Sequence, residues 1–325
     1  MAEIDIVVPI YNVESCVDEC LRSLRDQTFS DIRVLCVNDG STDNSQDIID
    51  KYVLMDERFI SLIKKNGGLS DARNYGLKRV NAPYVMFIDG DDICEKQMCQ
   101  KALEVIKKDD SDMVVFNYTQ LYTEDGREEV PPMRFNGCFA LKEKKELLAY
   151  TSNAAWNKLY KSSLFLDNGL EYPFGLRHQD LGTTPFLLAY ANKISYLNEP
   201  LYRYRVDRPG NITKAIDKKL RDILDIGEIV VNGFKKLGSF DEYKEELNYL
   251  LSVNMIQSLR KAVKLTDAEF VNSFIDDIFA FKKKHFGRNP KKYPVKEAAN
   301  DYIYLNKTML KLYYRYRTRK EKSHG

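Results

Sequence analysis

Short apolar runs alternate with helix-like patterns along the first 116 residues of the chain. Each run is long enough for one buried strand, and the runs lie at residues 4–8, 32–37, 60–63, 84–88 and 113–116. Between the runs, apolar residues recur at helical spacing, as at Val13, Val17, Leu21 and Leu24. Strands that alternate with helices form βαβ units, in which helices cover both faces of a mostly parallel sheet. The pattern therefore predicts an α/β fold.

After residue 117 this alternation ends. We expect a hairpin or loop at residues 124–126, a helix near residues 142–150, and two short strands within residues 193–205 that Pro200 separates. From about residue 216 the apolar spacing is helical, with three successive apolar faces. The sequence thus predicts a first domain over residues 1–213, with halves that meet near residue 116, and a helical region over residues 214–325.

The composition is that of a folded protein without a membrane span. Hydrophobic residues make up 44% of the 325 residues and charged residues 30%, which allows a large core. No window approaches the roughly 18 apolar residues of a membrane-spanning helix. The chain opens directly into a strand and shows no signal peptide. We therefore expect a cytoplasmic protein whose six cysteines are reduced.

The charge is distributed unevenly. Residues 281–325 carry 14 Lys or Arg and 3 acidic residues, a net charge of +11, whereas the first 280 residues carry 36 basic and 45 acidic residues, a net charge of −9. Tyrosines are interleaved with this basic tail at positions 302, 304, 313, 314 and 316. An apolar helical face is expected at Leu305, Met309, Leu312 and Tyr316.

Two interpretations of the basic tail stay open. The helix could lie on an anionic membrane surface, peripherally at the inner face of the cell membrane. It could equally pack on the core and keep a solvated outer face. Binding of nucleic acid is not expected, because no recognised nucleic-acid module accompanies the charge.

The segment YVMFIDGDD, residues 84–92, ends a buried strand in a group of carboxylates. Asp89 and Asp91 form a D-x-D pattern, and such oxygen ligands suit a hard cation, Mg²⁺ or Mn²⁺, that also holds substrate phosphates. The alternative is a solvated turn with Gly90 at positive φ. Asp92 is expected to cap a helix.

Three predicted strands end in polar or aromatic residues, namely Tyr11, Asp39 and Asp89. Ligands of parallel sheets bind beyond the carboxyl ends of the strands, so these side chains can converge on one cleft. No G-x-G-x-x-G follows the first strand, which argues against a dinucleotide-binding fold.

Four motifs in register resemble the family 2 glycosyltransferases of the GT-A fold. They are PIYNVE (residues 9–14), VNDGSTDNS (37–45), NGGLSDARNYGL (66–77) and FIDGDD (87–92), and WNKLY, HQD and YRYR extend the likeness to about residue 213. The resemblance implies a catalytic domain with a nucleotide-sugar half over residues 1–116 and an acceptor half over residues 117–213. It also implies a divalent metal and a nucleotide-sugar donor, expected to be a UDP-sugar.

The resemblance also assigns roles to individual residues. It places Pro9, Tyr11 and Glu14 beside the nucleotide, Asp39 on the base, Arg73 near the phosphates, Asp89 and Asp91 in the metal motif, and Asp180 as the general base. The sequence departs from the family pattern at Gln179, where the family usually has Glu, and at Asn38 and Asn211, where Asp and Ser are frequent. Gln179 removes one negative charge beside the proposed base.

Four further residues have two interpretations each. Trp156, with Asn157 beside it, could form a wall for the acceptor or the donor, or belong to the core. His178 could be a third metal ligand or a spectator. Arg205 could close over the diphosphate or belong to a solvated run of charge.

These observations predict an inverting glycosyltransferase that moves a sugar from a nucleotide sugar to a hydroxyl of a growing glycan or a lipid-linked glycan. Asp180 would take the hydroxyl proton, and no second nucleophilic carboxylate is evident, which favours a single displacement. Two alternatives stay open. One is transfer to a polyprenyl phosphate, and the other is a catalytically silent GT-A protein that binds a glycan or a partner.

Overall fold

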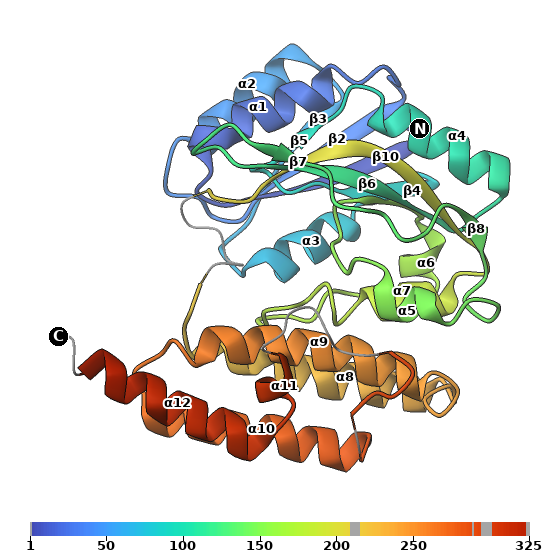
Figure 1. Cartoon of the computed structure of the whole chain (residues 1–325). Coiled ribbons are helices and arrows are strands. Elements are labelled where there is room, and N and C mark those ends of the chain that lie inside the picture. Colours follow the sequence, from blue (N-terminus) through green and yellow to red (C-terminus); the bar gives the residue numbers. More distant parts are fainter. Residues whose placement is uncertain (1, 209–214, 288, 294–300, 323–325) are drawn as a thin grey trace. The chain divides into compact units, whose positions relative to one another are not determined.

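The computed structural model of the chain describes residues 2–208, 215–287, 289–293 and 301–322 (Figure 1). The chain divides into two compact units. The first comprises residues 1–144, 152–175 and 183–211, and the second comprises residues 145–151, 176–182 and 212–325. The segments 145–151 and 176–182 belong to the second unit, whereas the sequence placed them in the first domain. The predicted boundary at residue 213 lies outside the described residues.

A mixed sheet forms the centre of the first unit. Its strands run in the order β3-β2-β1-β4-β9-β6-β10-β5, with β7 paired to β6 and β8 paired to β10. The neighbours β3, β2, β1 and β4 are parallel, as are β6 and β10, whereas β9 is antiparallel to both β4 and β6. The strands are β1 Ile4–Ile10, β2 Ile32–Asn38, β3 Phe59–Ile63, β4 Tyr84–Phe87, β5 Ile93–Cys94, β6 Met113–Leu121, β7 Glu128–Glu129, β8 Gly137–Phe139, β9 Lys158–Lys161 and β10 Ile194–Arg205.

Helices cover both faces of this sheet, which confirms the predicted α/β fold (Figure 1). They are α1 Glu14–Arg25, α2 Ser45–Met55, α3 Leu69–Leu77, α4 Met98–Asp109, α6 Ser163–Leu166 and α7 Thr184–Tyr190. Alternate β1 residues such as Ile6 and Val8 share one core cluster with α1, α2 and α4. The opposite face meets α3, where a Cβ on Gly76 would lie 2.4 Å from Val7 Cγ1. Gly76 therefore allows α3 to lie directly on the sheet.

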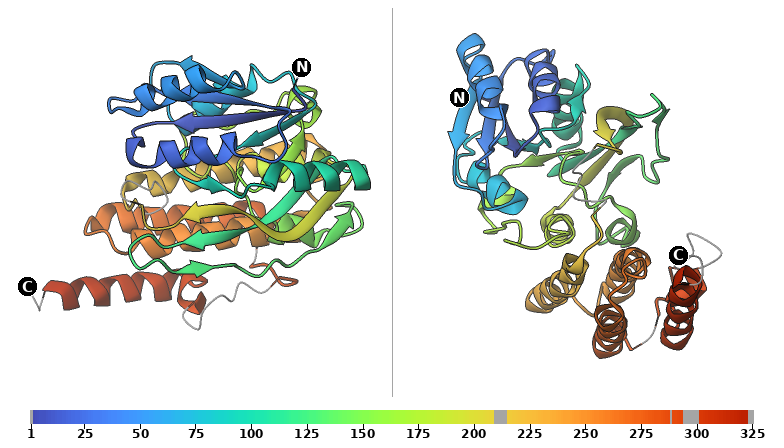
Figure 2. Two further views of the ribbon diagram at one scale, coloured as in Figure 1. Left: turned by 90° about the horizontal axis from the view of Figure 1, so that it is seen from above. Right: turned by 90° about the vertical axis from the view of Figure 1, so that its left-hand side faces the viewer.

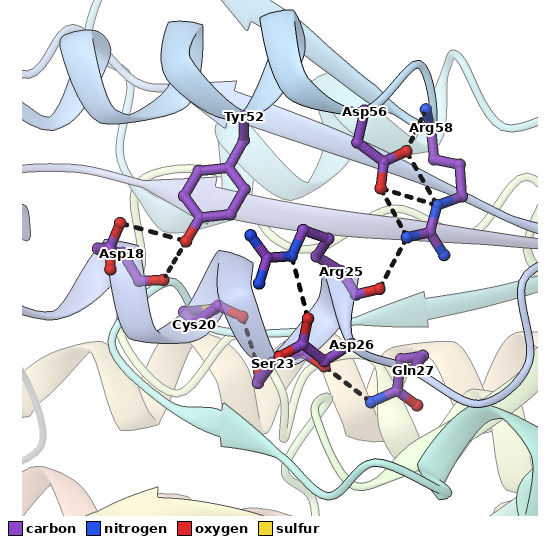
Figure 3. Close-up of polar contacts among 9 residues, drawn as sticks. All are labelled: Asp18, Cys20, Ser23, Arg25, Asp26, Gln27, Tyr52, Asp56 and Arg58. Atoms are coloured by element: carbon purple, nitrogen blue, oxygen red, sulfur yellow. Dashed lines mark hydrogen bonds and ion pairs between the residues drawn. The ribbon is translucent and has the colours of Figure 1, made fainter.

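Polar contacts join α1 to its neighbours (Figure 3). The Tyr52 hydroxyl of α2 donates to the carbonyl of Asp18, at 2.9 Å. Beyond α2, Arg58 Nη2 donates to the carbonyl of Arg25 at 2.7 Å. These bonds satisfy carbonyls of α1 and fix the helix across the first two βα units.

Two predicted strands were expected to end at a proline, Pro9 or Pro200, and in the structure both strands continue through it. Strand β1 continues through Pro9 to Ile10, and its pairing with β4 already ends at Val7. Residues 194–205 form one strand, not two, because register shifts on either side of Pro200 accommodate the proline. All six cysteines are free thiols, of which five are buried and Cys138 is exposed.

Helices form most of the described part of the second unit, and those after residue 216 agree with the predicted helical spacing. They are α5 Glu146–Tyr150, the 3₁₀ helix η2 Lys218–Arg221, α8 Asp222–Lys236, α9 Lys244–Ala262, α10 Ala268–His285, α11 Asp301–Tyr304 and α12 Lys307–Lys322. At Gly227 of α8, a Cβ would lie 2.8 Å from the ring of Phe281, so the glycine lets α10 approach closely. None of the helices in the described ranges combines the length and the hydropathy that a bilayer-spanning segment requires.

A buried lysine in α10 makes the stability of this unit depend on pH. Lys282 is 8% exposed, its Nζ donates to Asn289 Oδ1 at 2.8 Å, and burial lowers its pKa to about 8. Between pH 8 and the ordinary lysine pKa, the unfolded chain binds more protons than the folded chain, so the free energy of unfolding rises with pH in that window.

We expect Lys282→Met to raise the thermal midpoint at pH 7, because the substitution removes a charge whose burial costs about 3 kcal/mol. Melting curves at several pH values measure the effect. The advantage over wild type should shrink as the pH rises from 8 toward 10. An advantage that did not depend on pH would contradict this account.

Candidate active site

The acidic segment after β4 lies at the carboxyl end of the parallel strands. Gly90 packs against the end of β1, where a Cβ would lie 3.0 Å from the carbonyl oxygen of Pro9. Gly90 is not among the glycines with positive φ, so this close approach, and not the turn conformation, calls for glycine. The side chains of Asp89 and Asp91 are 22% and 20% exposed. The segment thus presents two partly accessible carboxylates beside the end of β1.

Each of these carboxylates is paired with an arginine from a different element. Arg73 of α3, 1% exposed, donates from Nη2 to Asp89 Oδ1 at 2.7 Å. The ring of Tyr172 lies 5.2 Å from the Arg73 guanidinium carbon. Arg208, just beyond β10, donates from Nε to Asp91 Oδ2 at 2.6 Å. The structure therefore brings Arg73 to the D-x-D segment, and its contact with nucleotide phosphates stays a prediction.

Two carboxylates of this segment, Asp91 and Asp92, have raised pKa values. Burial raises the pKa of Asp91, and the charge of Asp89 raises it further. Asp92 is buried, and its pKa lies well above the ordinary value because of burial and its two acidic neighbours. Three carboxylates so close together are stabilised in their charged form by a nearby cation.

The expectation that Asp92 caps a helix was wrong, because the short strand β5 follows it. Its carboxylate instead accepts hydrogen bonds from the Tyr202 hydroxyl and the Arg205 backbone N–H, both at 2.8 Å. Asp92 thus joins the acidic segment to β10, the strand that leads to Arg208.

Asp39, at the end of β2, is 2% exposed and holds the loop that begins α3. Its carboxylate accepts hydrogen bonds from the backbone N–H groups of Gly67 at 3.0 Å and Gly68 at 2.8 Å. Lys64 Nζ lies 2.5 Å from the same carboxylate. Gly68 has φ +88°, a value that favours glycine. The contact of Asp39 with a nucleotide base stays a prediction.

The loop after β1 is joined to the loop after β2. Glu14 Oε2 accepts hydrogen bonds from the backbone and side-chain nitrogens of Asn44, both at 2.8 Å. Asn12, in the left-handed region at φ 51°, accepts from the Thr42 backbone N–H at 2.8 Å. Tyr11, next to Asn12, is 49% exposed. The structure therefore brings Pro9, Tyr11 and Glu14 to the same sheet edge as Asp39 and Asp89.

Trp156 and Asn157 lie in the core of the first unit. The Trp156 ring is 8% exposed and stacks between the rings of Tyr202 and Tyr204, at centroid distances of 4.6 and 5.2 Å. Asn157 is 3% exposed and donates to the carbonyl of Phe116 at 3.0 Å. These contacts match the core interpretation of Trp156, and a contact with the acceptor stays a prediction.

The Arg205 side chain contacts residues of α1. Its Nη2 pairs with Glu19 of α1, and its Nη1 lies 3.9 Å from the Cys16 sulfur. The side chain is 10% exposed. Its contact with a diphosphate stays a prediction.

The predicted base lies in the segment 176–182 of the second unit. Asp180 is half-buried in the turn before α7, whose N-cap position is Thr183. His178 has φ 60°, and burial, followed by the charge of Lys261, lowers its pKa to about 4. Its Nε2 is buried and has no hydrogen-bond partner among the described residues. His178 is therefore neutral at physiological pH.

The D-x-D segment fits a divalent cation with an incomplete set of protein ligands. Asp89 and Asp91 offer hard oxygen donors, and both already face cationic groups. In the described ranges, no group of three His, Cys, Asp or Glu side chains is arranged to hold a metal ion. The protein can thus supply part of a coordination shell, which for Mg²⁺ and Mn²⁺ is commonly completed by water and substrate phosphate.

Sequence reasoning missed two cations of this site. Arg208 appears in the sequence only as one of three arginines near the end of β10, and Lys64 only as one of two lysines after β3. The pairing of Arg208 with Asp91 depends on the course of β10 beside the acidic segment, which spacing along the chain does not reveal. Lys64 could have been suspected, since it precedes the NGG loop that Asp39 binds.

The amino-acid sequence is similar to that of known glycosyltransferases. A sequence profile described as Glycosyl transferase family 2 matches residues 5–168, about half of the chain. The glycosyltransferase EpsJ of Bacillus subtilis is 32% identical over 270 residues, which are 79% of this chain and 76% of that protein. The glycosyltransferase GlyG of Streptococcus pneumoniae is 29% identical over 271 residues, 76% of this chain and 89% of that protein.

A solved structure shares the fold. Residues 1–349 of TarS from Staphylococcus aureus, crystallised with UDP-GlcNAc, superpose with a TM-score of 0.58 and 21% sequence identity, covering 88% of this chain and 89% of that one. The likeness confirms the mostly parallel sheet with flanking helices and a helical C-terminal region.

Proposed function

Since the chain belongs to glycosyltransferase family 2 and is thus a glycosyltransferase, we propose that it transfers a sugar, with inversion, from a UDP-sugar to a hydroxyl group of a glycan or lipid-linked glycan. The observation that carries this proposal is the convergence of Asp39, Arg73, Asp89 and Asp91 at one edge of the sheet. The UDP-GlcNAc with which the TarS fragment was crystallised supports a uridine donor.

The donor would lie across the carboxyl ends of β1, β2 and β4. Tyr11, which is exposed, would contact the base and ribose. The Asp39 carboxylate, which binds the Gly67 and Gly68 N–H groups, would also accept a hydrogen bond from the base. Arg73, held by Asp89, and Arg208, held by Asp91, supply positive charge for the phosphates. These groups would orient the diphosphate as the leaving group.

Asp89 and Asp91 would hold Mn²⁺ or Mg²⁺. When bound, such an ion neutralises the charge that develops on the diphosphate as the bond to the sugar breaks. The two arginines already balance the carboxylates in this structure, so binding of the ion would release at least one guanidinium toward the phosphates.

Asp180 would take the proton of the acceptor hydroxyl as its oxygen attacks the anomeric carbon. A single displacement by that oxygen inverts the configuration, and the nucleoside diphosphate leaves from the opposite side. Asp180 lies three residues before Thr183, the N-cap position of α7. Transfer to a polyprenyl phosphate would need a phosphate site in place of this base.

A panel of donors tests the proposal. Purified protein with Mn²⁺ would be given UDP-, GDP-, dTDP- and CDP-linked sugars, and release of the nucleoside diphosphate would be measured with and without glycan acceptors. We expect release from a UDP-sugar and lower release after chelation of the metal. The proposal would be wrong if the protein consumed no donor, or consumed only a donor that is not UDP-linked.

Arg208→Gln separates the role of this arginine from simple structural support. We expect the affinity for Mn²⁺ without donor to rise about tenfold, because Asp91 loses a charge-assisted partner, and kcat for transfer to fall. Calorimetry or the electron paramagnetic resonance of free Mn²⁺ measures the affinity. Arg203→Gln, at a partly exposed arginine of β10, is the matched control. A lower Mn²⁺ affinity in Arg208→Gln would contradict the assignment.

A further inference from the structure

Helix α12 packs on the helical unit through one of its faces. Leu310 and Tyr314 are 0% and 1% exposed, and the Tyr314 hydroxyl donates to the carbonyl of Leu265 at 3.2 Å. Lys307 and Lys311 each lie 2.7 Å from Asp276 of α10. The helix is therefore docked along α10 and does not extend freely from the unit (Figure 2).

The opposite face of α12 is apolar and exposed. Met309, Leu312, Tyr313 and Tyr316 follow one another at helical spacing, with exposed fractions of 50%, 57%, 37% and 66%. In the described part of the second unit, they are four of the seven exposed large apolar side chains. Leu305, which the sequence placed on the same face, is instead partly buried against the cluster of Tyr249 and Tyr293. The prediction for Leu305 was therefore wrong.

The exposed apolar face belongs to a strongly basic helix. Helix α12 carries seven Lys or Arg and one Glu, a net charge of +6. Asp276 balances one of these charges through Lys307 and Lys311. Arg315, next to the apolar face, is exposed. The helix thus combines exposed apolar and aromatic groups with excess positive charge.

We propose that this face of α12, formed by Met309, Leu312, Tyr313 and Tyr316 with Arg315 beside them, docks on an anionic lipid surface. Apolar side chains on such a helix enter the boundary between headgroups and acyl chains, and tyrosine is enriched there. Each basic residue near an anionic leaflet strengthens binding about fivefold. A second copy of the chain is a poor occupant, because it would bring two helices of charge +6 together.

Sedimentation of the full chain with vesicles tests the proposal. We expect binding to phosphatidylcholine vesicles that contain phosphatidylglycerol, weak binding to pure phosphatidylcholine, and a loss of binding as salt is added. The double substitution Leu312→Glu with Tyr316→Glu should lower the partition coefficient at least about tenfold. Arg315→Gln should lower it about fivefold.

Leu54→Glu is the matched control, because Leu54 of α2 is 88% exposed and lies in the other unit. It should bind vesicles as wild type does. Equal binding of the double variant and wild type would overturn the proposal, as would equal binding to neutral and anionic vesicles. Self-association that the double variant abolishes, with vesicle binding unchanged, would identify a second copy as the occupant.

This inference does not depend on the proposed function. Release of nucleotide from a soluble donor, measured without lipid, should be equal in wild type and the double variant. Failure of vesicle binding would leave the transferase reaction untouched, and failure of every donor would leave the vesicle result untouched.

Discussion

Asp91→Asn should lower the rate of sugar transfer by at least about 100-fold. The substitution keeps the size of the side chain and removes the charge that would hold the metal ion and the diphosphate. Because Asp91 is partly buried and its pKa is raised, the neutral amide should leave the thermal midpoint unchanged or slightly higher. Release of UDP in the presence of Mn²⁺ measures the rate.

Asp110→Asn is the control for this substitution. The same Asp-to-Asn change at Asp110 affects a side chain that is 84% exposed. The backbone of Asp110 has the left-handed conformation, which Asn tolerates. It should match wild type in rate and in thermal midpoint. Wild-type activity in Asp91→Asn would refute the metal assignment, and a collapsed thermal midpoint would assign Asp91 a structural role instead.

Asp180→Asn should lower kcat by about 10²- to 10⁴-fold, the range expected for removal of a general base. Affinity for UDP, measured by calorimetry, should stay at the wild-type value, because the base acts on the acceptor and not on the nucleotide. The split between a lost kcat and an intact affinity distinguishes Asp180 from Asp91, whose loss should weaken both.

The substitution Gln179→Glu, next to Asp180 in the chain, gives a second test of Asp180 as the base. A carboxylate at position 179 restores the charge that the family usually has there and should raise the pKa of its acidic neighbour. The acidic limb of the pH–rate profile should then move to higher pH. An unchanged profile, together with near-wild-type activity in Asp180→Asn, would exclude Asp180 as the base.

Apart from the two-residue strand β5, the order of strands and helices in the first 116 residues could be predicted, because each buried strand is a compact apolar run that ends in a turn. The same logic placed Tyr11, Asp39 and Asp89 at neighbouring strand ends, where the structure brings them. Boundaries near proline could not be predicted, because β1 and β10 accommodate Pro9 and Pro200 through local pairing that depends on their neighbours.

The partners of the charged side chains were the least predictable part of the site. Arg205 and Arg208 are three residues apart in one basic segment, yet one pairs with Glu19 and the other with Asp91. Asp92 resembled a cap and instead binds Tyr202, which is 110 positions away. Such pairs are set by the packing of distant segments, and spacing along the chain carries no information about them.

Helix α3 ties two parts of the candidate site to a single rigid body. Its leading loop binds Asp39, its first turns carry Arg73 to Asp89, and Gly76 fixes the helix on Val7. A shift of this helix would therefore displace the nucleotide-facing carboxylate and the phosphate-facing arginine together. In chimeras with related enzymes, residues 66–77 should consequently be exchanged as one cassette with the β1 residue beneath them, since piecemeal grafts would misalign both contacts.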